Sequence, residues 1–436
     1  MWASQKDAQL IQLQEENRKL RRAVDELVIL NELALDIGAK LDLQEILRLV
    51  VKRSIKAVHA EQGTITLVKR QQQDLQQTLV RTQQSTDHGQ PFHLNQALLG
   101  WMQLNKRPLV VRDPHHDSRF HGIVWDQNIH SLMCVPLLIK STLIGILAVI
   151  NKKDGEFSDE DTRLLTIVAS QSAQIIENVR LYEEEKDLLQ IKEQLRLASQ
   201  IQSSLLPKQA PSIPGYDIAG YSKPAQVVGG DYFDFICVGP GRLALCVGDI
   251  SGKGLPAAML MANLQATIRG QCAVDPSPGV CLGRANALLH QSTDPQKYAT
   301  LFYCILDFQN HQLTYSNAGH NWPYLIRRNG ANSLLKAGGV ALSFLPNAEY
   351  EQESVVLSPG DLCVLYSDGL TEAMNANDEE YGEKRLLACI QQNGELAAGQ
   401  LINKLIESAE NHAKNCPQWD DMTLVVIKRI GINDTD

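Results

Sequence analysis

Acidic residues lie beside turns at the ends of several apolar runs in the C-terminal half of the chain. Strand ends of a β-sandwich gather at one rim, so carboxylates far apart in sequence are expected to converge there. Clustered carboxylates repel and raise one another's pKa, and hard divalent cations such as Mg²⁺ or Mn²⁺ offset this through oxygen coordination. The residues are Asp231 and Asp234 in VGGDYFDF, Asp249 in LALCVGDI, Asp368 in LCVLYSDG, and Asp420 and Asp421 in DDMTLVVI.

Two such cations can activate a water molecule and clamp a phosphoryl group, so this set of residues predicts metal-dependent phosphoester hydrolysis. Any one of these acids alone would be read as an ordinary turn residue, because Asp followed by Gly is common turn chemistry. The spacing of the whole set favours a catalytic role over six separate turn residues. Glycines beside the acids suit a backbone that approaches a ligand closely, namely Gly229, Gly230, Gly252 and Gly254.

The elements that must position these acids are mostly paired strands. Apolar runs such as YFDFICV, RLALCVGDI and ATLFYCILDF alternate with turn signals after Pro207, where a second domain begins. Helical periodicity fits residues 255–271, 279–291, 383–392 and 395–414. The domain at 207–432 is therefore predicted to be α+β, with antiparallel sheets and helices outside.

Upstream of this domain, residues 159–206 contain no Gly or Pro, and Ser158 is a suitable N-cap before three acidic residues. One helix is expected to run throughout. Its second half, residues 181–206, keeps an apolar seam and is interpreted as a parallel dimeric coiled-coil linker. The seam residues are Leu181, Leu188, Ile191, Leu195, Ala198 and Leu205.

The N-terminal part divides into two predicted regions. Residues 1–28 carry a heptad with Asn17 at a seam position and predict a coiled coil; an amphipathic helix packed on the next domain is the alternative. Residues 29–180 mix helix and strand, and two apolar runs, SLMCVPLLI and LIGILAVINKK, predict paired strands of a central antiparallel sheet.

Composition limits the partners and the location. Lys plus Arg total 41 against 50 Asp plus Glu, a net charge of −9, which argues against nucleic acid or an anionic membrane surface as a partner. No window reaches the roughly 18 apolar residues of a membrane helix. A cytoplasmic protein is expected, whose nine scattered cysteines remain reduced in the core.

As an ordered set, VGGDYFDF, VGDISGKG, SNAGHN, YSDGLTEA and WDDMTLVV closely resemble the PPM family of metal-dependent serine/threonine phosphatases, in its SpoIIE-type branch. The resemblance covers about residues 200–430 and implies two Mn²⁺ or Mg²⁺ ions. It implies that Asp249 bridges them, that the Ile250 carbonyl binds one, and that Asp368 and Asp420 hold the other. Asp231 would contact the metals or their waters.

Other residues of these motifs are expected to support the site. Asp234 and Asp421 stand where the family tolerates other residues. Lys253 replaces a common His and could attract the phosphate, or it is a solvated loop lysine. Gly369 follows Asp368, and His320 supports the site or is a structural turn histidine.

Residues 27–180 resemble a GAF sensory domain. Asn151-Lys152, Phe157 and Asp161 partly match the pattern of cyclic-nucleotide-binding GAF domains, with Thr162 in place of an acid. This pattern either binds a ligand or only braces the fold, and ligand identity does not follow from fold. Whether this domain binds a small-molecule ligand is therefore an open alternative.

We therefore expect a homodimeric phosphatase made of a GAF domain, a coiled-coil helix and a PPM-type α/β sandwich. By resemblance, its substrate is a phosphorylated anti-sigma-factor antagonist of the STAS type, and residues 198–206 form a regulatory helix. Two alternatives remain, another two-metal phosphoesterase and a catalytically silent GAF-based scaffold. The presence of all four principal acids argues against the scaffold, because clustered carboxylates are costly without a metal. These acids are Asp231, Asp249, Asp368 and Asp420.

Overall fold

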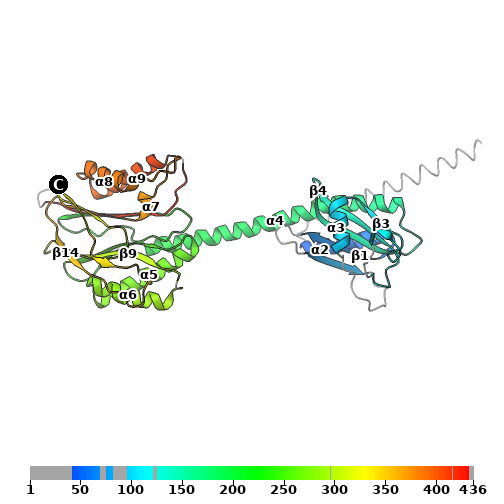
Figure 1. Ribbon diagram of the computed structural model, residues 1–436, viewed down its shortest axis with the longest axis horizontal. Helices are drawn as coiled ribbons and strands as arrows, with labels where there is room; N and C mark the ends of the chain where they lie inside the picture. The colour runs from blue at the N-terminus through cyan, green and yellow to red at the C-terminus, as the bar shows by residue number, and fades with distance from the viewer. Residues whose placement is uncertain are drawn as a thin grey trace, which may run out of the picture. The chain divides into compact units, whose positions relative to one another are not determined.

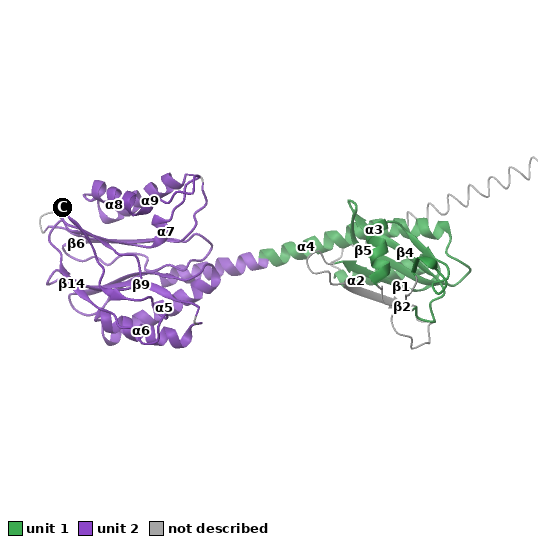
Figure 2. Cartoon of the chain, in the orientation of Figure 1, with its two compact units in different colours: residues 1–189 green, residues 190–436 purple. Residues whose placement is uncertain are grey.

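The structure is a computed structural model that describes residues 42–68, 75–81, 96–120, 125–294, 296–414 and 416–431. The chain divides into two compact units, residues 1–189 and 190–436 (Figure 2). The coiled coil predicted for residues 1–28 lies outside the described residues. Within the described part, no helix has the length and apolar character needed to cross a membrane.

The first unit is built on a five-stranded antiparallel sheet in the order β2-β1-β5-β4-β3. The central strand β5 is buried along eight consecutive residues, as its apolar sequence predicts. The strands are β1 (Ala60–Val68), β2 (Leu75–Arg81), β3 (Leu109–Val111), β4 (Leu132–Ile139) and β5 (Thr142–Lys152).

Helices cover both faces of this sheet. Helix α2 (Leu43–Ala57) and the first part of α4 pack their apolar sides into one core with β1, β4 and β5. Helix α3 (Gln96–Asn105) contributes Leu98 and Met102 to a second core on the opposite face. The predicted antiparallel sheet flanked by helices is confirmed.

Helix α4 runs without a break from Asp159 to Leu205, as expected. Ser158 and Asp161 form a reciprocal capping box at its start, because the Asp161 amide donates to Ser158 Oγ and the Ser158 amide donates to Asp161 Oδ2. Beyond residue 180 its apolar seam is largely exposed, with Leu188 at 59% and Ile191 at 53%. Whether this seam pairs with a second chain stays a prediction.

The second unit is a sandwich of two sheets. One sheet has the order β13-β10-β9-β8-β7 with β14 paired to β10, and the other has the order β12-β11-β15-β16-β6. The first sheet contains β7 (Tyr232–Cys237), β8 (Arg242–Ile250), β9 (Ala299–Asp307), β10 (Gln312–Ala318), β13 (Gly338–Gly339) and β14 (Glu353–Val356). The second contains β6 (Tyr216–Lys223), β11 (Tyr324–Ile326), β12 (Asn332–Leu334), β15 (Leu362–Tyr366) and β16 (Met422–Arg429).

Two pairs of helices close the outer faces of the sandwich, one pair on each side (Figure 1). Helices α5 (Leu255–Val274) and α6 (Pro278–Ser292) pack on the first sheet, and α8 (Gly382–Asn393) and α9 (Ala398–Ala413) pack on the second. The two sheets share an apolar core that includes Phe233, Val247, Phe302 and Leu365. The predicted α+β sandwich is confirmed.

Six of the nine cysteines lie in the core as predicted, whereas Cys237 is exposed and Cys389 and Cys416 are partly buried. All nine are free thiols. Burial raises the pKa of the Cys134 and Cys363 thiols to about 12, which keeps them protonated. They are packing residues.

Candidate active site

The acids predicted to work together come from both sheets of the second unit. Asp231 precedes β7, and Asp249 is the penultimate residue of β8, in the first sheet. Asp368 follows β15 and opens the short helix α7 (Asp368–Thr371), while Asp420 stands two residues before β16, in the second sheet. The rim where the two sheets meet therefore brings together carboxylates from four strand ends.

The charges of these carboxylates act on one another. The pKa of Asp249 is raised to about 7, first by burial and then by the charges of Asp368, Asp420 and Asp421. Burial and the nearby Asp249 raise the pKa of Asp231 well above its ordinary value, and burial and Asp420 raise that of Asp368. Burial and neighbouring like charges both disfavour the ionised form of a carboxyl group.

Ser367 connects the two sheets directly at this rim. Its hydroxyl donates to Asp231 Oδ2 at 2.7 Å, while the Thr423 amide of β16 donates to the same hydroxyl oxygen at 2.9 Å. Ser367 is fully buried, so this bridge is shielded from water. It fixes the Asp231 carboxyl against the strand ends that carry Asp368 and Asp420.

The Ile250 carbonyl, predicted as a metal ligand, lies next to Gly230. A Cβ atom placed on Gly230 would stand 3.2 Å from that carbonyl oxygen and 3.5 Å from Asp249 Oδ1. The missing side chain therefore leaves space around two predicted ligands, which is the close approach expected of a glycine beside the acids.

Asp421 braces the loop that carries Asp231. Its Oδ1 accepts from the Ala225 amide at 2.7 Å, and its Oδ2 accepts from the Gly230 amide at 2.6 Å. The carboxylate is thus engaged with backbone N–H groups on both oxygens. The structure places it as a support of the 225–231 segment.

Asp234 has a different set of partners. It is fully buried on β7, where it accepts from Tyr232 Oη at 2.8 Å and forms a two-point ion pair with Arg269 of α5. This pair ties α5 to the first sheet. The structure therefore pairs Asp234 with Arg269, and not with the other predicted acids.

Lys253 and Gly369 both lie against the 419–421 segment. Lys253 Nζ is 2.9 Å from Asp420 Oδ2, donates to the Trp419 carbonyl and stands over the Trp419 ring at 4.9 Å. A Cβ atom on Gly369 would stand 2.1 Å from the Asp421 carbonyl oxygen, so only glycine allows α7 to pack on this backbone.

His320 is buried and supports the end of β8 through Thr300. Its Nδ1 lies 2.8 Å from Thr300 Oγ1, which in turn lies 3.4 Å from the Asp249 carbonyl oxygen. Burial lowers the pKa of His320 to about 4, so the ring is neutral near pH 7. Its place is behind the backbone of Asp249, and Asn317 also ties it into a turn, so its supporting role stays a prediction.

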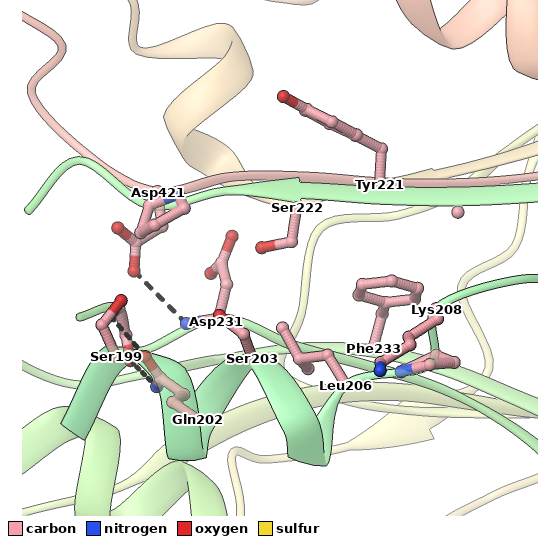
Figure 3. Close-up of a pocket in the computed structure, with 14 residues that line it drawn as sticks. Ser199, Gln202, Ser203, Leu206, Lys208, Tyr221, Ser222, Asp231, Phe233 and Asp421 are labelled. Carbon is pink, nitrogen blue, oxygen red and sulfur yellow. Dashed lines mark hydrogen bonds between the residues drawn. The ribbon is translucent and has the colours of Figure 1, made fainter. Parts of the chain in front are cut away.

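The last turn of α4 reaches the same loop from the opposite side. Gln202 clamps Gly229, because its Nε2 donates to the Gly229 carbonyl at 2.6 Å and its Oε1 accepts from the Gly229 amide at 3.0 Å. A cavity of about 250 Å³ lies between this turn and β6, and the carboxyl groups of Asp231 and Asp421 are among its lining (Figure 3). The helix end and the acids thus share one segment of backbone, residues 229–231.

The predicted metal ligands are carboxylate oxygens and the Ile250 carbonyl oxygen, and hard divalent cations prefer oxygen ligands of these kinds. Burial, and after it the charges of neighbouring acids, raises the pKa of Asp231, Asp249 and Asp368, and the positive charge of bound cations would offset both effects. In the described part of the chain, no three His, Cys, Asp or Glu side chains converge tightly enough to enclose one ion. The carboxyl groups would therefore have to close in on bound cations.

In the GAF-like unit, the residues that match the cyclic-nucleotide pattern form contacts with one another and with nearby backbone. Asn151 Oδ1 accepts from the His130 amide and its Nδ2 donates to the Asn128 carbonyl. Lys152 Nζ lies 2.7 Å from both carboxylate oxygens of Asp161 and 5.9 Å from the centre of the Phe157 ring. The pattern braces the strand–helix connection here.

Sequence reasoning missed three residues that the fold brings to the acids. Ser367 directly precedes Asp368 in YSDG, so its position in a motif was a signal. Gln202 and Thr300 carry no local signal, because a helical Gln and a strand Thr are common everywhere. Their roles depend on the 202–229 and 300–320 contacts, which bridge distant parts of the chain.

Comparison with known proteins gives two family matches. Residues 239–430 match the Stage II sporulation protein E (SpoIIE) family, and residues 40–177 match the GAF domain. The SpoIIE match begins after Asp231, so the assignment of Asp231 to the site depends on its position in the fold.

Two curated relatives match the chain over about half its length. Protein IcfG of Synechocystis is 27% identical over 263 residues, 54% of this chain and 41% of IcfG. Phosphoserine phosphatase RsbU of Bacillus subtilis is 28% identical over 241 residues, 55% of this chain and 71% of RsbU. The chain thus spans less than half the length of IcfG.

Among solved structures, the SiaA-PP2C domain of Pseudomonas aeruginosa superimposes with a TM-score of 0.50 at 21% identity. The match covers 56% of this chain and 98% of that domain. At this level of identity the likeness concerns the fold, and it agrees with a PP2C-type sandwich in the second unit.

Proposed function

The chain carries a GAF domain followed by a SpoIIE-type domain of the PPM phosphatase family, and on this premise we propose that it is a metal-dependent protein serine/threonine phosphatase. One observation carries the proposal: Asp231, Asp249, Asp368 and Asp420 come from two sheets to one rim, where burial and mutual repulsion raise the pKa of the first three. A cluster of this kind is stabilised by divalent cations.

Asp249 would bridge two Mn²⁺ or Mg²⁺ ions, with the Ile250 carbonyl on one and Asp368 and Asp420 on the other. When bound, the ions supply an activated water and neutralise phosphoryl charge. The residues of the chain set the geometry for this chemistry. Ser367 orients Asp231, Asp421 holds the loop behind it, and His320 and Thr300 support the end of β8.

The substrate would be a phosphoserine or phosphothreonine protein, specifically a STAS-type anti-sigma-factor antagonist. The support is the resemblance of the motif set and the relation to RsbU, which is described as a phosphoserine phosphatase. An acidic protein with an anionic rim gains selectivity from contacts around the phosphate, so small phosphoesters should be poor substrates.

Regulation would come from the GAF domain, through α4, in a cytoplasmic homodimer. The support is the continuity of α4 from the first unit to Gln202, whose amide holds the loop that carries Asp231. The exposed apolar seam of α4 suits a second copy of the same helix.

The decisive experiment measures phosphate release by the full chain from a phosphorylated STAS-type protein, a phosphoserine peptide and a small aryl phosphate. Each assay is run with Mn²⁺, with Mg²⁺ and with a chelator. Release from the phosphoprotein that needs metal supports the proposal. Equal efficiency on the aryl phosphate would favour a general phosphoesterase, and no release under any condition would favour the scaffold.

A further inference from the structure

The loop that precedes β9 is fastened to the turn that follows the predicted metal ligands Asp249 and Ile250. The Ser251 amide donates to the Tyr298 carbonyl at 3.0 Å, and the Tyr298 amide donates to Ser251 Oγ at 3.0 Å. Both hydrogen bonds join the same two residues, Tyr298 of the loop and Ser251 of the turn. Lys297 is thereby held beside the Ser251–Gly254 turn, which directly follows Asp249 and Ile250 in the chain.

The Lys297 side chain lies across this turn. Its Nζ is 3.4 Å from the Ser251 carbonyl oxygen, and a Cβ atom on Gly252 would stand only 2.8 Å from the ammonium. Gly252 has φ of +98°, a conformation that glycine adopts without strain. The glycine therefore gives the turn its shape and leaves room for the ammonium group.

The two lysines at this turn differ in their partners. Lys253 is committed to Asp420 and to the Trp419 ring and carbonyl. Lys297 has no carboxylate within 4.0 Å among the residues that the structure describes, and its recorded partner is the Ser251 carbonyl. An ammonium has three donors, so Lys297 keeps donors and an unmatched charge for an incoming anion.

We propose that Lys297 binds the phosphoryl group of the substrate at the rim of the acid cluster. The proposal rests on the proposed phosphatase function and deepens it, because it separates two tasks. Lys253 stays with Asp420, and Lys297 attracts and orients a phosphate dianion that the surrounding carboxylates would otherwise repel. Strong, charge-assisted hydrogen bonds from an ammonium to phosphate oxygens suit this task.

Two substitutions of Lys297 test the proposal in the full chain with saturating Mn²⁺. Lys297→Met removes the charge and keeps much of the side-chain volume, while Lys297→Arg keeps the charge. Lys404→Met is the matched control, because Lys404 is an exposed lysine of α9 paired with Glu407. The readouts are KM for a phosphoserine peptide, the inhibition constant of inorganic phosphate, and the Mn²⁺ concentration for half-maximal activity.

We expect Lys297→Met to raise KM and the phosphate inhibition constant by about 10-fold or more, as loss of a hydrogen bond between charged groups does. Lys297→Arg should recover most of this loss, and Lys404→Met should match the parent. The Mn²⁺ requirement should be unchanged in all three. An unchanged phosphate inhibition constant in Lys297→Met, or an effect confined to Mn²⁺ affinity, would overturn the proposal and make Lys297 a brace of the turn.

Calorimetric binding of inorganic phosphate to the Mn²⁺-loaded protein separates this inference from the proposed function, because it needs no turnover. If the parent hydrolyses nothing yet binds phosphate, and Lys297→Met binds it at least about 10-fold more weakly, the phosphate site stands while the phosphatase function fails. If hydrolysis is present and both proteins bind phosphate equally, the phosphate site fails while the function stands. Thermal unfolding of each variant checks that the fold is retained.

Discussion

Asp249 is influenced by the charges of three other acids at the rim. It is the penultimate residue of β8, and burial raises its pKa to about 7 together with these charges. Its neighbour Ile250 presents a carbonyl oxygen into the space left by Gly230. One strand end thus supplies both a carboxylate and a carbonyl donor, so a change at Asp249 should affect both predicted metal sites together.

We expect Asp249→Asn to lower kcat for a phosphoprotein by at least about 100-fold at saturating Mn²⁺, because the substitution removes an anionic bridge and weakens both ions. Phosphate release and circular dichroism check the rate and the fold. Asp187→Asn, an exposed acid on α4, is the matched control and should behave like the parent. Rates near those of the parent for Asp249→Asn would remove Asp249 from the bridging role.

The same carboxyl group links stability to pH. Its pKa in the folded protein lies above the ordinary 3.8, so its contribution to stability is present at low pH and is lost as pH rises from about 4 to about 7. A difference of about 3 pKa units corresponds to roughly 4 kcal/mol at most. The chelated parent should therefore lose stability across this range, relative to a variant that lacks the charge.

With a chelator present, we expect Asp249→Asn to unfold at a higher temperature than the parent at pH 8, and at a similar temperature at pH 4.5. Mn²⁺ should raise the Tm of the parent at pH 8 more than that of the variant. His320 titrates in the same range with the opposite sign, since burial lowers its pKa to about 4, but both proteins contain it. A parent that is more stable than the variant at pH 8 under chelation would contradict the interpretation.

At the scale of elements, the end of α4 is joined to the loop before β7. Gln202 forms two hydrogen bonds with Gly229, and the next residue, Gly230, donates to Asp421. The loop is therefore held between a helix and a strand end from the other sheet. Movement of the helix would be transmitted to Asp231 through a single segment of backbone.

We expect Gln202→Ala to weaken the apparent Mn²⁺ affinity by about 3- to 30-fold, because two hydrogen bonds of roughly 1 kcal/mol each no longer hold the loop. An Mn²⁺ titration of phosphatase activity measures the change. Gln190→Ala, at an exposed position of the same helix, is the control and should leave the affinity unchanged. Equal affinities in Gln202→Ala and the parent would exclude the clamp as a positioning contact.

At the scale of the whole molecule, α4 is the covalent route between the two units. The helix spans 47 residues, and apolar residues of its seam are exposed in the single chain, which favours pairing with a second copy. If the paired helices transmit a signal, activity should depend on the rotational phase between the units. Insertions in the exposed stretch test this directly.

Four residues inserted after Lys186 should change phosphatase activity several-fold, because they add about 40° beyond one turn and create a stutter in the heptad. Seven residues inserted at the same place restore the heptad and should leave activity close to that of the parent. Phosphate release and light scattering measure activity and oligomeric state. A fully active monomer, or equal rates for both insertions, would refute a dimeric transmitter.

The sequence by itself determined most of the architecture. Apolar runs ending in Asp249 and Asp368 indicated strands that stop at acids. This was possible because the burial of a strand follows from the apolar residues within the strand itself. The absence of Gly and Pro between residues 159 and 206 likewise indicated one helix. The short strands β12 and β13 were not predicted, since two or three residues carry too little periodicity.

Only the tertiary structure decided which charged residues act together. Asp234 and Asp421 look alike in sequence, each close to a predicted ligand, yet Asp234 pairs with Arg269 and Asp421 holds the 225–231 loop. For Lys253 the sequence left open a phosphate-binding lysine or a solvated loop lysine, and only the structure shows its pairing with Asp420. The physical reason is that a charged group's role depends on its neighbours in space, and these come from segments up to about 200 residues away, which local patterns do not encode.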